Sequence, residues 1–281
     1  MNGKVLKKYF PLFALPTLAA FIIGFIVPFV MGIYLSFCKF TTVNDAKWVG
    51  FQNFKDIFRD PGFIHALWYT ALFSIVSIIT INVFAFTIAM LLTKGIRGTN
   101  IFRTVFFMPN LIGGIVLGYI WQLILNGILA KFGVTLTFSE VYGFWGMIIL
   151  MNWQQIGYMM IIYIAGIQNV PGELIEAARI DGATSVQVLG KVILPMVMPS
   201  ITICTFFTLT NSFKLFDQNL ALTNGAPSNN SELLALNIYN TFYGRVGYEG
   251  VGQAKAVVFF LIVGAIAVAQ LFFTRRKEVQ Q

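Results

Sequence analysis

Apolar residues run along this chain in long stretches that show no alternation with polar residues. A bilayer core about 30 Å thick requires about 20 apolar residues for each crossing helix. Six stretches without Asp, Glu, Lys, Arg or His are long enough: residues 9–38, 66–93, 104–130, 141–172, 192–213 and 256–274. Because a membrane β-barrel would alternate with period two, the pattern predicts an all-α polytopic membrane protein with six transmembrane helices.

Composition supports the same class. Of 281 residues, 57% are hydrophobic and 11% are charged, against roughly 25% charged residues in a typical soluble domain. A water-soluble globule is therefore excluded. Cys38 and Cys204 lie inside or at the edge of apolar stretches without CxxC spacing, which favours free buried thiols.

The charged residues predict the orientation. With six crossings, the segments on the same side as the two termini carry 11 basic and 4 acidic residues, and the segments on the other side carry 8 basic and 7 acidic residues. Cytoplasmic loops of membrane proteins are enriched in Lys and Arg. Both termini are therefore expected in the cytoplasm, and the net charge of +8 is expected as loop charge rather than as a nucleic-acid surface.

The first and third apolar stretches contain helix-modifying residues. The first stretch is too long for a cleaved signal peptide and lacks a small-x-small site, so we expect it to remain as a helix that Pro11, Pro16 and Pro28 kink or delimit. Gly114 and Gly118 form a GxxxG pattern in the third stretch, which predicts close packing with another helix.

The loop between the fourth and fifth stretches, residues 171–195, is unusual. Pro171 and Gly172 should end the fourth helix. Glu173 and Glu176 then fall in the first turn of a new short helix, where the helix dipole favours acidic side chains. This helix is too short to cross a membrane.

The remaining residues of this loop point to a protein contact. Gly182 allows a turn that other residues resist, and Asp181 can accept hydrogen bonds from backbone N–H groups there. The loop has three acidic residues and only Arg179 and Lys191 as basic ones. An anionic inner leaflet would repel it, so a cytoplasmic protein partner is favoured over an amphipathic connector on the membrane.

The spacing in this loop resembles a known motif. Glu176-Ala177-Ala178, then Asp181-Gly182-Ala183, then Val192-Ile193-Leu194-Pro195 after residues 184–191, look like the EAA loop of binding-protein-dependent ABC importer permeases. Residues 48–54 (WVGFQNF), 103–109 (RTVFFMP) and 222–227 (LTNGAP) resemble the carbohydrate-uptake branch of that family.

The resemblance implies a type I ABC importer transmembrane domain with a coupling helix between helices 4 and 5. Residues 1–65 would form the first helix and first extracytoplasmic loop, and residues 66–281 the core permease with its coupling loop. The ATPase-contacting positions implied are Glu176, Ala177, Ala178, Asp181 and Gly182.

The same resemblance implies the partners. They are a second permease subunit, a cytoplasmic ATPase pair and an extracytoplasmic sugar-binding protein at a bacterial cell membrane. The second permease is expected to be a similar but distinct chain in a heterodimer, with a homodimer as the alternative. The chain itself has no GxxxxGK[ST] phosphate loop, since Gly190-Lys191 lacks the upstream glycine and the following hydroxyl residue. No cofactor is expected on this chain, and ATP and Mg²⁺ are expected on the ATPase.

A pathway for neutral, hydroxyl-rich sugars should offer amides, hydroxyls and aromatic faces rather than charges. By resemblance, the solute contacts fall at Gln155, Tyr158, Thr208, Asn211 and Ser212. The alternative for each residue is a hydrogen bond between helices, worth about 0.6 kcal/mol on average.

Other functions are less well supported. An ion-coupled secondary transporter would normally have charged residues inside the membrane and two related halves with broken helices, and the sequence shows neither. A membrane enzyme is disfavoured because the single histidine excludes HExxH and multi-histidine metal sites, and no GxSxG motif is present. A channel has little support without a filter-like repeat.

Overall fold

The computed structural model describes residues 3–275 and is almost entirely helical. Within these residues, six segments are long and apolar enough to cross a membrane, which confirms the predicted number. They are Phe10–Ser36, Pro61–Leu92, Gly114–Phe132, Glu140–Gln168, Ser185–Phe213 and Glu249–Thr274.

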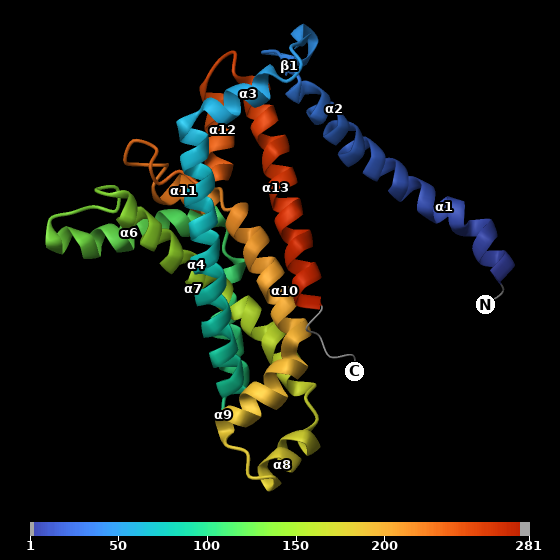
Figure 1. Cartoon of the computed structure of the whole chain (residues 1–281), viewed down its shortest axis with the longest axis vertical. Helices are drawn as coiled ribbons and strands as arrows, with labels where there is room; N and C mark the ends of the chain where they lie inside the picture. The colour runs from blue at the N-terminus through green and yellow to red at the C-terminus, as the bar shows by residue number, and fades with distance from the viewer. Residues whose placement is uncertain (1–2, 276–281) are drawn as a thin grey trace. The chain divides into compact units, whose positions relative to one another are not determined.

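The helices and strands follow the chain as drawn in Figure 1. The helices are α1 (Gly3–Phe21), α2 (Val27–Ser36), α3 (Gln52–Arg59), α4 (Pro61–Leu92), α5 (Thr99–Phe107), α6 (Gly114–Leu129), α7 (Glu140–Gln168), α8 (Gly172–Ile180), α9 (Ser185–Val188), α10 (Leu194–Phe213), α11 (Asp217–Leu222), α12 (Leu234–Gly244) and α13 (Glu249–Arg275). The short strands β1 (Cys38–Lys39) and β2 (Lys47–Trp48) pair antiparallel.

The chain forms two compact units. The first contains Met1–Asp60 and Ile238–Phe260, and the second contains Pro61–Asn237 and Leu261–Gln281. The expected functional division into residues 1–65 and 66–281 stays a prediction, and residues 276–281 of its second part lie outside the described residues.

The core of the second unit lies where α4, α7 and α10 pack together. Ala85 and Ala89 of α4 are fully buried, and their small side chains let the neighbouring helices pack closely. Met151 and Met159 of α7 fill the space between the helices. Cys204 of α10 is buried in the same core, and both cysteines are free, as predicted.

Polar side chains link α4 to α7 inside this apolar core. The Asn152 side-chain amide donates to the Thr80 hydroxyl at 2.9 Å, and the Tyr163 hydroxyl donates to Asn82 Oδ1 at 2.6 Å. Polar groups in the membrane interior need such partners because neither lipid nor water supplies them. These residues therefore act as interhelical contacts.

The third apolar stretch, 104–130, is not one helix. It breaks between α5 and α6 at a 3₁₀ turn, Met108–Leu111, followed by an extended Gly113. Pro109 removes a helical N–H, and the paired glycines that follow allow the chain to change direction. In Figure 1, α6 consequently runs across the direction of α4.

The GxxxG pattern packs closely, as predicted, and its partner is the short helix α11. A side chain on Gly114 would meet the Asp217 Cβ at 2.7 Å, and one on Gly118 would meet the Ala221 Cβ at 2.7 Å. The two glycines therefore bring α6 and α11 together.

A second close approach joins α5 to α7. A side chain at Gly157 would collide with the backbone carbonyl of Phe106. Backbone atoms cannot move aside as a flexible side chain can, so this contact requires a glycine. It fixes α5, and hence the break that follows it, against α7.

The first unit is held by a buried amide. The Asn53 side chain on α3 donates to the carbonyls of Ser36 and Cys38, both at 2.9 Å. Gly250 lies against the same Cys38 carbonyl, where a Cβ would not fit. These contacts tie the end of the first span to the start of α13.

Prolines in the first span coincide with a change in helix type. Pro11 and Pro16 lie inside α1, whereas Pro28 is the second residue of α2, which directly follows a π-helical turn, Ile22–Ile26. The wider turn relieves the clash between the proline ring and the preceding backbone. The prolines therefore modify the span without ending it.

The sixth span contributes a buried lysine to an ion pair. It begins at Glu249, seven residues before the predicted 256, and so includes Lys255. The fully buried Lys255 ammonium lies 2.7 Å from an Asp60 carboxylate oxygen and donates to the Thr241 hydroxyl at 2.8 Å. The expectation that the spans lack charged residues is therefore wrong for this position.

We expect Gly157→Leu to lower the thermal stability of the purified chain, because overpacking against rigid backbone costs about 1–3 kcal/mol. Gly127→Leu is the matched control, since Gly127 is also helical and has no neighbouring atom within 4 Å of the place that a Cβ would occupy. The measurement is the melting temperature in detergent by size-exclusion chromatography. Equal melting temperatures for the two variants would contradict the contact.

We also expect Asp60→Asn to destabilise the chain by about 3–5 kcal/mol, because it leaves the buried Lys255 charge without its carboxylate. Adding Lys255→Met should recover much of this loss, since the double variant removes both charges. The measurement is the free energy of unfolding of both variants, from unfolding curves in the same detergent. A double variant less stable than Asp60→Asn alone would refute the assignment.

Candidate functional site: a surface turn and a polar band

The loop at residues 171–195 folds into two short helices around a tight turn. Helix α8 starts after Pro171 and ends at Ile180, with Asp181 as its C-cap. Gly182 follows with φ +80°, its N–H donates to the Arg179 carbonyl at 3.1 Å, and the Ala183 N–H donates to the Ala178 carbonyl at 2.9 Å. This pair of bonds is a Schellman motif, which requires a left-handed residue at the position of Gly182.

The second half of this loop is also fixed locally. Thr184 caps α9 through a capping box, in which the Gln187 N–H donates to the Thr184 hydroxyl at 3.4 Å and the Thr184 N–H donates to Gln187 Oε1 at 2.8 Å. A π-helical turn, Leu189–Ile193, then leads into α10, with Pro195 in the first turn. The turn is therefore rigidly attached to the fifth span.

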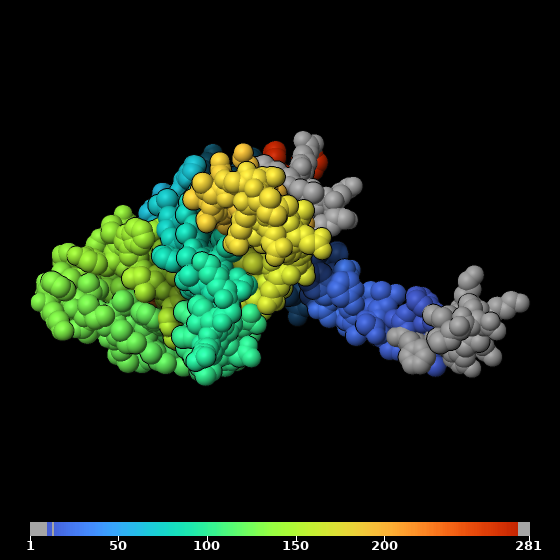
Figure 2. All heavy atoms as spheres, turned by 90° about the horizontal axis from the view of Figure 1, so that it is seen from below, coloured from blue at the N-terminus to red at the C-terminus, as the bar shows by residue number. Residues whose placement is uncertain are grey.

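The predicted coupling residues lie at the surface of the second unit. Glu176, Ala177, Asp181 and Gly182 are exposed, whereas Ala178 is half-buried and packs towards the core. Figure 2 shows this segment uncovered at one end of the unit. The helix end is held by the backbone bonds described above and not by the Asp181 carboxylate, for which the sequence suggested that role.

Apolar side chains accompany these acidic residues on the surface. Ile180 is 86% exposed and Val186 is 77% exposed, and Leu174 is also exposed. A cavity of about 280 Å³ lies behind the turn, lined by Ala178, Asp181, Gly182, Ala183, Gln187, Lys191 and Val192. Exposed apolar side chains around an acidic tip are typical of a protein contact surface.

Two of the five predicted pathway residues meet. The Asn211 side-chain amide on α10 donates to Gln155 Oε1 on α7 at 3.3 Å, and both residues are half-buried. Two amides so paired keep unused donors and acceptors, because each amide has two donors and two acceptor lone pairs. They can therefore exchange this bond for bonds to a hydroxyl-rich solute.

The other three predicted residues lie differently. Tyr158 is half-buried between the rings of Phe107 and Phe207, with ring centroids 6.3 and 5.9 Å away. Thr208 and Ser212 are fully buried, and their hydroxyls donate to backbone carbonyls of their own helix at 2.8 and 2.6 Å. In this conformation the two hydroxyls serve the helix and do not face a path.

The structure adds a pair of glutamines to this region. The Gln218 side chain on α11 donates to Gln154 Oε1 at 2.9 Å, and Gln154 donates to the Ile112 carbonyl at 3.3 Å. Gln154 thus satisfies a carbonyl that the break after α5 leaves free. We call Gln154, Gln155, Asn211 and Gln218 the amide cluster.

Asn219, also on α11, organises the loop that follows. Its amide donates to the Ser231 carbonyl at 2.8 Å and its oxygen accepts from the Leu233 N–H at 2.8 Å. The residue is fully buried. Sequence reasoning did not single it out, and an isolated Asn after a span gives little signal of such a role.

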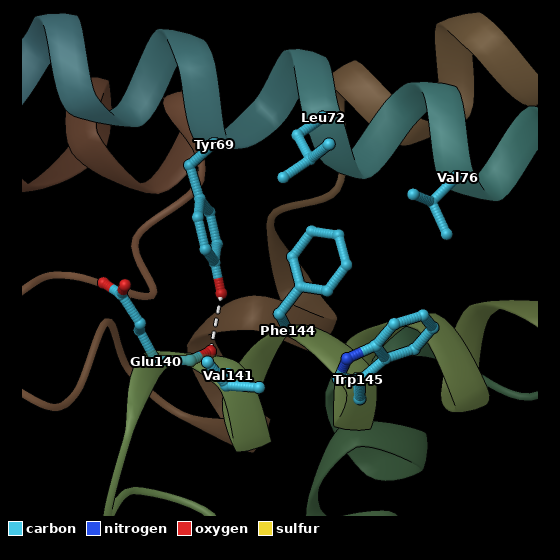
Figure 3. A pocket seen from close by; sticks show the side chains of 7 residues that line it. All are labelled: Tyr69, Leu72, Val76, Glu140, Val141, Phe144 and Trp145. Atoms are coloured by element: carbon cyan, nitrogen blue, oxygen red, sulfur yellow. Dashed lines mark hydrogen bonds between the residues drawn. The ribbon is translucent and has the colours of Figure 1, made fainter.

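A cavity of about 350 Å³ between α4 and α7 is chemically different. Figure 3 shows the Tyr69 hydroxyl pointing towards the Glu140 backbone carbonyl, 3.1 Å away, with Phe144 and Trp145 along the same wall. Leu72, Val76 and Val141 complete an almost wholly apolar lining. A sugar would find aromatic faces but few hydrogen-bond partners there, so this cavity is less suited to a sugar than the paired amides are.

The class of protein is defined by fold and sequence together. The chain resembles the structure of a bacterial ABC transporter that imports the acidic polysaccharide alginate, with a TM-score of 0.80 at 21% identity, covering 97% of this chain and 98% of that one. The fold is that of an ABC importer transmembrane domain.

The family matching residues 62–278 is described as binding-protein-dependent transport system inner membrane component, and the chain belongs to it. It is 43% identical to a probable starch degradation products transport system permease protein of Thermoanaerobacterium thermosulfurigenes, covering 96% of this chain and 94% of that protein. It is 30% identical to a multiple sugar-binding transport system permease protein of Streptococcus mutans, over 98% and 99% of the two chains. Nothing in these comparisons supports an ion-coupled transporter.

Proposed function

We propose that this chain is one of two different permease subunits of an ATP-driven importer for a sugar or oligosaccharide. An extracytoplasmic binding protein delivers the solute, and a cytoplasmic ATPase pair, which binds ATP and Mg²⁺, drives transport. The observation that carries the proposal is the rigid, exposed α8 turn with acidic and apolar side chains, on a chain whose relatives include sugar permeases.

The α8 turn is suited to transmit force. Its Schellman motif and the capping box of α9 hold the turn, and α10 continues from it through the π-helical turn. A displacement of Glu176 and Gly182 by the ATPase therefore moves the fifth span as a nearly rigid body, which changes the access of the solute pathway.

The amide cluster is suited to the solute. It has hydrogen-bonding capacity without net charge, and its Gln154–Gln218 pair lies at the break between α5 and α6, where Gln154 donates to the Ile112 carbonyl. Neutral sugars need such donors and acceptors, and a discontinuous helix in a membrane is typical of a solute-binding region. The cluster would be reorganised when the pathway opens.

The proposed orientation places both termini and the α8 turn in the cytoplasm. The excess of Lys and Arg on that side supports it. The segments 37–60 and 214–248 then face outwards, where the binding protein would arrive.

We expect Glu176→Lys and Gly182→Pro to abolish ATP-dependent uptake in proteoliposomes that contain the whole transporter. The first reverses a charge on the exposed tip, and the second cannot adopt the positive φ of Gly182. Glu173→Lys is the matched control, with the same charge change on the same exposed helix outside the proposed contact set. Normal uptake by both test variants, with the chain present in the membrane, would exclude the coupling role.

We expect Asn211→Ala to lower the rate of sugar uptake by about tenfold, or to change which sugars are taken up, while assembly with the ATPase is unchanged. The loss of one hydrogen bond costs about 1.4 kcal/mol, which corresponds to a factor of ten. Thr210→Val on the same helix is the control, because the Thr210 hydroxyl donates to backbone carbonyls of its own helix. Uptake of a panel of mono- and oligosaccharides is the readout. Unchanged uptake of every sugar in Asn211→Ala would remove the pathway assignment.

A further inference from the structure

A polar cavity of about 390 Å³ lies in the first unit, whereas the α8 turn and the amide cluster both belong to the second. Its lining comes from the end of α3, the end of α12 and the start of α13, and consists of Asp56, Arg59, Asp60, Thr241, Arg245, Tyr248 and Val251. Except for Val251, these residues lie outside the six candidate spans.

The charges around this cavity are not balanced. Asp60 is neutralised by the buried Lys255, and Asp56 accepts a hydrogen bond from Gln52 at 2.9 Å. In the described part of the chain, neither Arg59 nor Arg245 has a carboxylate partner, and both are exposed. The Asp60–Lys255 pair is neutral as a whole, and the neutral Gln52 amide does not offset the charge of Asp56. The two guanidinium groups therefore face one uncompensated carboxylate, and the cavity has an excess of one positive charge.

Two guanidinium groups in a confined polar space select an anion, and most readily a planar carboxylate that can accept paired N–H bonds. One wall is already rigid because the Asp60 carboxylate and the Thr241 hydroxyl are both bonded to Lys255. That wall is therefore ordered before an anion binds, and the ordering cost of binding falls on Arg59 and Arg245 alone.

The surroundings indicate that the anion belongs to a protein. Three large apolar or aromatic side chains lie within two residues of the lining, namely Phe58, Tyr243 and Val246. They are exposed, and because they lie outside the candidate spans, lipid does not explain their exposure. Tyr248, which itself lines the cavity, is also exposed. Tyr and Arg around a pocket are typical of the centre of a protein–protein interface, whereas a free anion would need no apolar collar.

We propose that this cavity receives an acidic side chain of the extracytoplasmic binding protein, held between Arg59 and Arg245. The inference rests on the proposed function, because it needs this unit's connecting segments to face outwards and a binding protein to reach them. The binding protein would contribute a carboxylate flanked by apolar surface.

The test uses the whole transporter in lipid nanodiscs and the binding protein encoded with it. The dissociation constant of the binding protein is measured at several salt concentrations for Arg59→Glu/Arg245→Glu and for the milder Arg245→Gln. Lys39→Glu/Lys55→Glu is the matched control, since both lysines are exposed, belong to the same unit and do not line the cavity. Size-exclusion chromatography checks that each variant assembles.

We expect the double arginine variant to raise the dissociation constant of the binding protein by at least about tenfold and to make this constant depend less on salt concentration. Both effects follow from the loss of a hydrogen-bonded charge pair. Arg245→Gln should weaken binding less, and it tests the contact even if the double variant does not assemble. A Glu→Lys or Asp→Lys change on the binding protein should restore affinity for the double variant but not for the control.

Several results would overturn the inference. Unchanged affinity in the arginine variants, or an equal loss in the lysine control, would show that the cavity holds no specific carboxylate. A wild-type transporter that binds no binding protein at all would count against the proposed function itself, whereas normal wild-type binding with unaffected variants counts only against this contact.

Discussion

Backbone N–H and C=O groups inside a membrane must find partners within the protein, because lipid offers none. This constraint explains why the spans are helical, and it also governs where they are interrupted. The break between α5 and α6 leaves the Ile112 carbonyl without a helical partner, and the Gln154 side-chain amide donates a hydrogen bond to it at 3.3 Å. The amide cluster is thus tied to the break: the same side chain that stabilises the interruption also meets Gln218 at 2.9 Å.

Close backbone contacts hold this arrangement in place. Gly157 lets the Phe106 carbonyl lie against α7, and Gly114 and Gly118 bring α11 against α6. Each glycine has no side chain, and each lies where two segments approach most closely. The break between α5 and α6, which precedes the third span, is therefore fixed on both sides, by α7 before the break and by α11 after it. Gln154 and Gln218 are positioned as a consequence.

The extent to which sequence predicts this structure depends on the range of the interactions. The six spans and the Gly182 turn follow from local properties, namely apolar length and the need for a left-handed residue, and both were predicted. The Gln154–Gln218 pair joins residues 64 positions apart, and it depends on a break whose direction no local pattern specifies. Thr208 and Ser212 were expected to contact the solute, but their hydroxyls bond to carbonyls of their own helix. Helix and solute offer competing bonds of similar strength, and residue type and spacing cannot decide between them.

Lys255 shows that a charge within a span need not mean ion coupling. A residue that couples transport to an ion gradient must gain and lose its charge or its ion during the cycle. Lys255 is fully buried, 2.7 Å from Asp60 and bonded to Thr241, so its ammonium keeps both partners only while it stays charged and in place. The pair is therefore suited to a permanent structural role, and the energy for transport must enter elsewhere, which is consistent with force applied through the α8 turn.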